Sequence, residues 1–279
     1  MAASDPTRNY SLGYTDAEHE RLIAQASRLA PLTHRLFLGA GIGPGQRVLD
    51  LGSGVGDVAL LVAGLVGPSG EVVGVERDAR SAARAGARAA EAGLRNVNFI
   101  QSDVSEIPGD KPFDAAVGRF ILEFVPDPLS TLCAVCRLVR PGGVLAFHEP
   151  CHAAVLLLSA HLPLWSASVS LIRQTFQGSG AHTDIGLELH RLFLEAGLPR
   201  PAVHMEILMD SKPDFTRLTY GVLCSLLPQI QQQNLSVEPL GDFATLAERL
   251  QAEVDASKAA VPFVAMVGAW SRKLPLASS

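Results

Sequence analysis

Short apolar runs alternate with longer amphipathic stretches through the first half of the chain. The amphipathic stretches include 57–65 and 78–92, which have the spacing of helices. Strands that alternate with helices favour a parallel sheet covered by helices on both faces. The sequence therefore predicts an α/β, doubly wound, Rossmann-like fold. Its first four strands are expected at 47–51, 71–75, 96–101 and 113–117.

The second half continues the sheet but interrupts it. An Arg-Pro-Gly-Gly turn at 140–143 predicts that the fifth strand starts at Val144 and runs to Phe147. The sixth and seventh strands are expected at 202–209 and 260–270. Two helical insertions separate these strands, at 153–180 and 213–257, and we find no internal repeat.

Helices are also expected before the first strand. Thr15 and Glu18 form a capping box that predicts a helix to about Leu29. Pro31 predicts the first turn of a second, short helix that ends near Leu38. We divide the chain into an N-terminal helical segment (1–44), a core (45–150), an apolar helical insertion (151–182) and a C-terminal part (183–279) that contains the insertion 213–257.

Composition limits the classes of partner. The 279 residues are 48% hydrophobic and 18% charged, with a net charge of −5. This balance argues against a nucleic acid or an anionic membrane as partner. Four cysteines without a regular framework, and an opening segment without the features of a signal peptide, favour the cytoplasm.

Residues 153–172 contain no charged side chain and are long enough to cross a bilayer. His161, Pro163 and several serines within this stretch argue against a membrane span. A buried helix pair or a lid over a pocket is expected instead.

The sequence 48–57 carries the main chemical signal, because Asp50 ends an apolar strand and glycines follow at 52, 54 and 56. A strand, a glycine turn and a helix start present backbone N–H groups to a ligand. A dinucleotide fingerprint would place its third glycine at 57, where Asp57 would repel a pyrophosphate. No Gly-Lys-Ser/Thr of a P-loop follows. The ligand is expected to be cationic or rich in hydrogen-bond donors.

This D-x-G-x-G-x-G motif resembles motif I of the class I S-adenosylmethionine-dependent methyltransferases. The resemblance covers about 45–150 strongly and the rest loosely, and the chain is similar in overall layout to the small-molecule enzymes of ubiquinone and menaquinone biosynthesis. It implies a seven-stranded sheet with an antiparallel last strand. It also implies S-adenosylmethionine as cofactor, S-adenosylhomocysteine as product, and a hydrophobic small molecule methylated on O, N or C.

The resemblance also implies a cofactor site. Glu76 would accept the ribose hydroxyls, Asp103 the adenine amino group, and the backbone near Gly118 the cofactor ammonium. Glu76 as a surface carboxylate and Asp103 as a helix N-cap remain alternatives. Tyr10 and Tyr14 would either cover the cofactor or only staple the N-terminal helices. The predicted cofactor-binding residues are Tyr10, Asp50, Gly52, Ser53, Gly54, Gly56, Glu76, Arg77, Asp103, Val104, Gly118, Arg119 and Phe120.

Acceptor chemistry is expected at the end of the fifth strand. His152, and after it His148, are candidate general bases, with a structural histidine as the alternative. The sequence 118–121 lacks the Asn/Asp-Pro-Pro-aromatic motif of amino-methylating DNA enzymes. Apolar residues around the insertions would bind the acceptor. These predicted substrate-binding residues are Phe124, Trp165, Phe176 and Tyr220.

Several other interpretations remain open. Cys133 and Cys136 share a helix face, but no second pair with zinc spacing exists, so we expect no metal. Arg80, Arg84 and Arg88 form a stripe that favours a solvated helix face over an RNA track. A cyclase or isomerase of the same fold, a non-catalytic cofactor-binding module and a dinucleotide oxidoreductase are the rival functions. A homodimer is left open.

Overall fold

The computed structural model describes residues 12–13, 15–103, 106–107 and 111–275. Seven strands form one sheet in the order β3-β2-β1-β4-β5-β7-β6. All neighbouring pairs are parallel except those of β7, which runs antiparallel to both β5 and β6. This confirms the predicted fold class and the antiparallel last strand. The strands are β1 (Arg47–Leu51), β2 (Glu71–Glu76), β3 (Val97–Gln101), β4 (Phe113–Arg119), β5 (Val139–Cys151), β6 (Ala202–Asp210) and β7 (Val261–Arg272).

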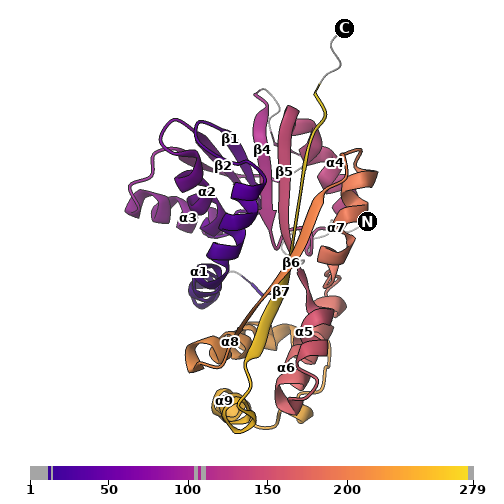
Figure 1. Cartoon of the computed structure of the whole chain (residues 1–279). Coiled ribbons are helices and arrows are strands. Elements are labelled where there is room, and N and C mark those ends of the chain that lie inside the picture. The colour runs from indigo at the N-terminus through magenta and orange to yellow at the C-terminus, as the bar shows by residue number, and fades with distance from the viewer. Residues whose placement is uncertain (1–11, 14, 104–105, 108–110, 276–279) are drawn as a thin grey trace, which may run out of the picture.

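Helices cover both faces of this sheet and form a lobe beyond it (Figure 1). The helices α1 (Asp16–Gly39), α2 (Asp57–Val66) and α3 (Ala79–Glu91) lie on one face. The helices α4 (Pro128–Leu138) and α7 (Ile185–Glu195) lie on the other. Below the sheet in this view, β6 and β7 reach the lobe built by α5 (His152–Leu158), α6 (Pro163–Gly178), α8 (Pro213–Gln232) and α9 (Leu246–Ser257).

Side chains that point alternately to the two faces of the central strands form two hydrophobic cores, one on each face of the sheet. Val48 on β1 packs with α2, whereas its neighbour Leu49 packs with the α4 and α7 side. Successive side chains of a strand point to opposite faces, so a strand buried on both faces needs a continuous apolar run. This is why 48–49 and 72–73 contain no polar residue.

The N-terminal helix differs from its prediction. Thr15 caps it as expected, and its hydroxyl accepts from the N–H of Glu18 at 3.2 Å. However, α1 is one helix of 24 residues with Pro31 in its interior, not two helices. Pro31 and Ser27 lie on the exposed side of the helix, while the buried residues Leu29 and Leu32 anchor the helix on both sides of Pro31. Packing therefore overrides the local helix-breaking signal.

The fifth strand is longer than predicted. Val139 already pairs with Phe113, and after a register shift Val144 pairs with Ala115. The Arg140–Gly143 stretch is therefore a bulge inside β5 rather than a turn before it. At its other end β5 continues to Cys151, where it pairs with Ala265 of β7.

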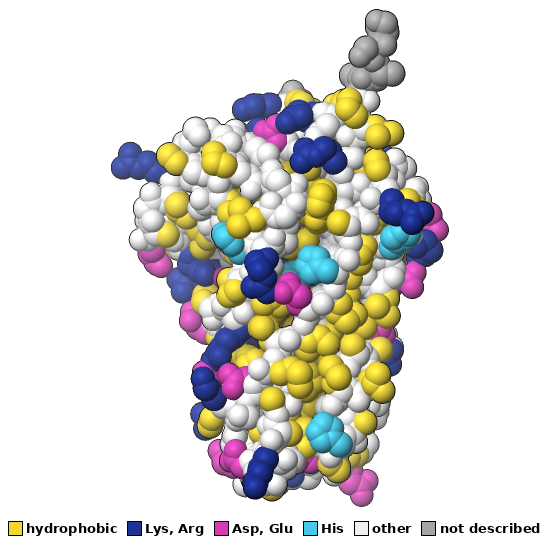
Figure 2. Space-filling view, in the orientation of Figure 1, with side chains coloured by type: hydrophobic (Ala, Val, Ile, Leu, Met, Phe, Trp, Pro, Cys, Tyr) yellow, Lys and Arg dark blue, Asp and Glu magenta, His cyan; other side chains and the backbone are white. Residues whose placement is uncertain are grey.

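The charge-free stretch forms α5 and most of α6, a helix pair as expected. Among the described residues, none of the helices combines the length and apolar character that a bilayer span requires. Apolar side chains nevertheless run down the middle of one face, from β6 and β7 to the helical lobe (Figure 2). Val203, Met205 and Met209 of the edge strand β6 and Leu157 of α5 are among the exposed apolar residues.

Candidate functional site

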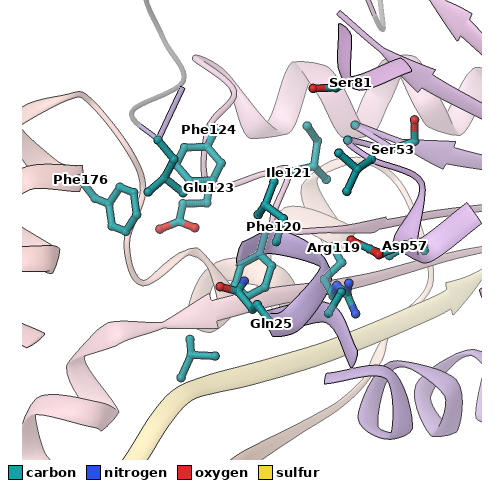
Figure 3. Close-up of a pocket in the computed structure, with 18 of the residues that line it drawn as sticks. Gln25, Ser53, Asp57, Ser81, Arg119, Phe120, Ile121, Glu123, Phe124 and Phe176 are labelled. Atoms are coloured by element: carbon teal, nitrogen blue, oxygen red, sulfur yellow. The ribbon is translucent and has the colours of Figure 1, made fainter. Parts of the chain in front are cut away.

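A cavity of about 280 Å³ lies at the carboxyl ends of the parallel strands. This is the edge at which open α/β sheets bind ligands. Figure 3 shows two ends of this cavity: Ser53, Asp57 and Arg119 lie at one end, and Glu123, Phe124 and Phe176 lie at the other. We call the first the glycine-loop end and the second the acceptor chamber.

The three glycines of the loop after β1 have different roles. All three have positive φ, at 64°, 52° and 89° for Gly52, Gly54 and Gly56. A Cβ on Gly52 would lie 2.9 Å from Cγ1 of Ile121, and one on Gly56 would lie 3.0 Å from Cβ of Ala85. A Cβ on Gly54 would meet nothing within 4 Å. Gly52 and Gly56 thus permit packing, whereas the backbone of Gly54 faces the open cavity.

Glu76, the last residue of β2, lies in the wall of the cavity at its glycine-loop end. Its Oε2 accepts from the N–H of Gly54 at 2.9 Å, and its Oε1 accepts from the N–H of Asp78 at 2.9 Å. Glu76, Arg77 and Asp103 all line the cavity. The backbone carbonyl of Asp103 also accepts from the N–H of Glu106 at 3.1 Å. The structure thus brings together the carboxylates that the sequence predicted at two neighbouring strand ends.

The stripe of arginines on α3 is paired rather than simply solvated. Arg88 is mostly buried and lies 2.8 Å from Asp57, and it also donates to the carbonyl of Val55 at 2.6 Å. Arg80 and Arg84 pair with Asp16 and Glu20 of α1. Arg88 therefore neutralises the acidic residue at the start of α2, and the other two arginines form solvent-accessible ion pairs with α1.

A buried polar group lies beneath the glycine-loop end. Burial raises the pKa of Asp50 to about 8, although the Arg119 guanidinium favours its charged form. Neither carboxylate oxygen has a hydrogen bond of good geometry to a described residue. Burial also lowers the pKa of Arg119, whose Nη1 donates to the hydroxyl of Thr33 at 3.1 Å. Of the two, Arg119 lines the cavity and Asp50 does not.

His148 is placed differently from its prediction. It lies inside β5, is fully buried and does not line the cavity. Its Nδ1 lies 3.1 Å from the hydroxyl of Thr33. Burial, with a contribution from Arg119, lowers its pKa to about 3. The structure therefore places His148 within the sheet and outside the cavity wall, in surroundings that favour its neutral form.

His152, in contrast, lines the acceptor chamber. Its Nε2 lies 3.3 Å from Oε1 of Glu123, which is buried. Its ring meets Phe176 edge to face at 5.7 Å. The sequence pattern indicated His152 but not Glu123, because a lone glutamate between apolar residues carries no motif.

Two of the four predicted acceptor contacts lie in the chamber. Phe124 and Phe176 line it and pack together at 5.7 Å. Trp165 is fully buried in the core and Tyr220 packs against that core, and neither lines the cavity. Gly56 and Gly118 are also outside the lining, and Tyr10 and Val104 lie outside the described residues. In the described ranges, no cluster of His, Cys, Asp or Glu is arranged to hold a metal ion.

Comparison with known families gives one match over residues 42–197, to the model described as "Methyltransferase domain". That range includes the glycine loop, Glu76, Asp103 and His152. The chain belongs to this methyltransferase family.

Curated relatives of this chain match over part of their length. The C-methyltransferase UbiE of ubiquinone/menaquinone biosynthesis from Coxiella burnetii is 38% identical over 111 residues, which cover 38% of this chain and 44% of the relative. The arsenite methyltransferase of Halobacterium salinarum is 30% identical over 140 residues, covering 47% and 36%. The chain thus spans less than half the length of these relatives.

Solved structures share the fold of this chain. The YcgJ protein of Bacillus subtilis superposes with a TM-score of 0.56 at 17% identity, covering 89% of this chain and 99% of that one. The cyclase SpnF superposes with a TM-score of 0.54 at 20% identity, covering 88% and 82%. At such identities the likeness establishes the fold alone.

Proposed function

We propose that this chain transfers a methyl group from S-adenosylmethionine to a hydrophobic small molecule. The observation that carries the proposal is the glycine-loop end, where Glu76 and the open backbone at Gly54 lie together on the wall of the cavity. Family membership and the names of the curated relatives support the same reaction.

The residues present fit the cofactor. Each oxygen of Glu76 accepts one backbone N–H and retains a further acceptor site for a ribose hydroxyl. Asp103 on the cavity wall would accept from the adenine amino group. Glu76 and Asp103, both in the cavity wall, make this end acidic, which favours a cationic sulfonium over a pyrophosphate. When bound, the cofactor would supply an electrophilic methyl group.

The acceptor chamber supports a hydrophobic organic acceptor. Phe124 and Phe176 lie in its wall, Ile172, Val222 and Phe263 also line the cavity, and apolar walls bind apolar ligands. This chain's own contribution to the reaction would be to hold the acceptor close to the methyl group and to exclude water.

A cyclase of the same fold is the main rival, and the likeness to SpnF does not separate the two because it concerns the fold alone. Titration calorimetry with S-adenosylmethionine, with NAD as the comparison ligand, tests the cofactor. Release of S-adenosylhomocysteine during incubation with candidate acceptors tests the reaction. Binding of NAD, or turnover without release of S-adenosylhomocysteine, would contradict the proposal.

We further propose a small-molecule partner rather than a nucleic acid, in a reducing cytoplasm. The pairing of all three α3 arginines with carboxylates and the four free cysteines support this. For a homodimer, the contact surface would be the edge strand β6, whose unpaired backbone edge and exposed apolar side chains favour pairing with a second copy. Light scattering measures the molecular mass in solution, and the mass of a single chain would contradict the homodimer.

A further inference from the structure

The acceptor chamber contains one buried carboxylate among apolar side chains. Glu123 is only 2% exposed, and its Oε1 makes no hydrogen bond of good geometry to a described residue. A buried carboxylate in such a place is costly unless a partner stabilises it. Its position in the wall of a ligand cavity indicates that the missing partner belongs to the chemistry of the site.

His152 is the group nearest to that oxygen, at 3.3 Å from its Nε2. The two groups are close enough for the Glu123 carboxylate to stabilise a protonated imidazole, although Nε2–H is not aligned for a hydrogen bond. Both residues line the cavity, so a bound acceptor can reach the pair.

Backbone hydrogen bonds fix the two segments that carry Glu123 and His152. Glu149, fully buried, accepts from the N–H groups of Ile121 and Leu122 at 3.1 Å and fixes the loop that carries Glu123. The carbonyl of Glu123 accepts from the N–H of His182, and the carbonyl of Thr183 accepts from that of His152. Two elements far apart in the sequence are thus fixed to each other, which keeps the two side chains together.

The charges around the pair are few. Burial raises the pKa of Glu149 to about 8, so this carboxyl is largely protonated near neutral pH. Asp184, the other carboxylate near His152, is paired with Arg173 at 2.7 Å. Glu123 is therefore the carboxyl group that an imidazolium of His152 would face.

Resting on the proposed function, we propose that Glu123 and His152 form the proton-accepting pair of the chamber. The acceptor is then a neutral, apolar molecule with an acidic hydroxyl, such as a phenol or an enol. His152 acts as the general base, and Glu123 positions it and stabilises its charged form.

The reaction balances without a further reactant. The acceptor oxygen forms a bond to the methyl carbon, the bond from that carbon to sulfur breaks with its electron pair leaving on sulfur, and the hydroxyl proton passes to His152. The imidazolium that remains is paired with Glu123. An ammonium acceptor would instead place a second cation beside the sulfonium against the single charge of Glu123, which the apolar chamber disfavours.

The test uses the full chain, labelled S-adenosylmethionine, and two matched probes, naphthol and naphthylmethylamine. We expect methylation of naphthol and not of the amine. His152→Asn lowers kcat about 100-fold and Glu123→Gln about 10-fold, with the naphthol KM changed less than twofold, because each removes part of a proton transfer. Glu123→Asp, which keeps a carboxylate, has a higher kcat than Glu123→Gln. The wild-type rate falls as pH drops, and His152→Asn abolishes that dependence.

His161→Asn is the matched control, because His161 is exposed and outside the cavity lining. Each variant is checked for an unchanged melting temperature and an unchanged Kd for S-adenosylmethionine. If the wild type binds S-adenosylmethionine but does not methylate naphthol, prefers the amine, or is insensitive to His152→Asn, the pair has no such role. Absence of S-adenosylmethionine binding in the wild type overturns the proposed function instead.

Discussion

The backbone N–H of Gly54 donates to Oε2 of Glu76 at 2.9 Å, and this bond joins the loop after β1 to the end of β2. The two residues are 22 apart in the sequence, and parallel pairing of Leu51 with Val75 brings them together. The bond orients the carboxylate before a ligand arrives. Preorganised groups lose less entropy on binding, which is why one side chain can contribute strongly to affinity.

Replacing Glu76 with Gln removes the charge and one acceptor oxygen. We expect the Kd for S-adenosylmethionine to rise about tenfold or more, because a hydrogen bond to a charged group contributes about 1.5–3 kcal/mol. Titration calorimetry measures the change. Glu71→Gln is the matched control, since Glu71 lies at the other end of the same strand and pairs with Arg47. An unchanged Kd in Glu76→Gln would remove Glu76 from the site.

Alanine at Gly54 and at Gly52 should give opposite results. Both positions have positive φ, which costs a non-glycine residue about 1–2 kcal/mol. At Gly52 the new methyl group also meets Ile121, so we expect the larger fall in melting temperature there. At Gly54, a lining residue, the methyl group meets no atom within 4 Å, so we expect a largely stable protein in which the added group obstructs S-adenosylmethionine. Titration calorimetry and thermal unfolding of both variants measure the two effects. Tight binding of S-adenosylmethionine by Gly54→Ala would contradict the placement of Gly54 in the cofactor site.

Arg88→Met tests the ion pair under the cavity. The substitution leaves Asp57 without its partner at a site where both side chains are only 17% exposed. We expect a loss of about 2 kcal/mol in the free energy of unfolding, measured with urea. The side chain of Arg80 is 67% exposed. Arg80→Met should therefore change the free energy of unfolding by less than about 0.5 kcal/mol. Equal effects would mean that Arg88 is no more than a surface residue.

Much of the fold was predictable because its signals are local. The run 47–51, the glycine loop and the strand that ends at Glu76 appear in the structure where the sequence predicts them. Pro31 and the bulge at 140–143 were not predictable in the same way. In both places long-range packing determines the outcome, through buried residues of α1 on either side of Pro31 and through the pairing of Val139 with Phe113.

The candidate site was predictable at its glycine-loop end and only partly in the chamber. Distance along the chain could not separate His148 from His152, although one is sealed in the sheet and the other lines the cavity. Glu123 becomes notable only when α5 brings His152 beside it. Trp165 has the same apolar character as Phe176, and the sequence does not reveal which of the two faces the cavity.

Asp50 should make stability depend on pH. Its folded pKa of about 8 lies above the ordinary 3.8, so the folded protein retains a proton that the unfolded chain releases between these values. Its contribution is present below pH 3.8 and is lost as pH rises to about 8, at up to about 1.4 kcal/mol per pH unit. Asp50→Asn should therefore become progressively more stable than the wild type as pH rises, measured by urea unfolding without ligand. The pKa of Glu149 is also raised, but Glu149 is present in both proteins and its effect cancels in the comparison. A difference in free energy of unfolding between Asp50→Asn and the wild type that does not change with pH would therefore contradict the burial argument for Asp50.

Phe176 and Trp165 lie on the same helix, α6, but should respond differently to truncation. Phe176 lines the chamber against Phe124 and His152, so Phe176→Ala should widen the acceptor range while the Kd for S-adenosylmethionine stays within about twofold. Trp165 is fully buried outside the cavity lining, so Trp165→Ala should cost about 3–5 kcal/mol of stability and not change the ratio of kcat/KM values between acceptors. A series of aromatic acceptors of increasing size, with melting temperatures recorded in parallel, separates the two effects. If Trp165→Ala changed the acceptor range and Phe176→Ala did not, the chamber would have to be placed on the other side of α6.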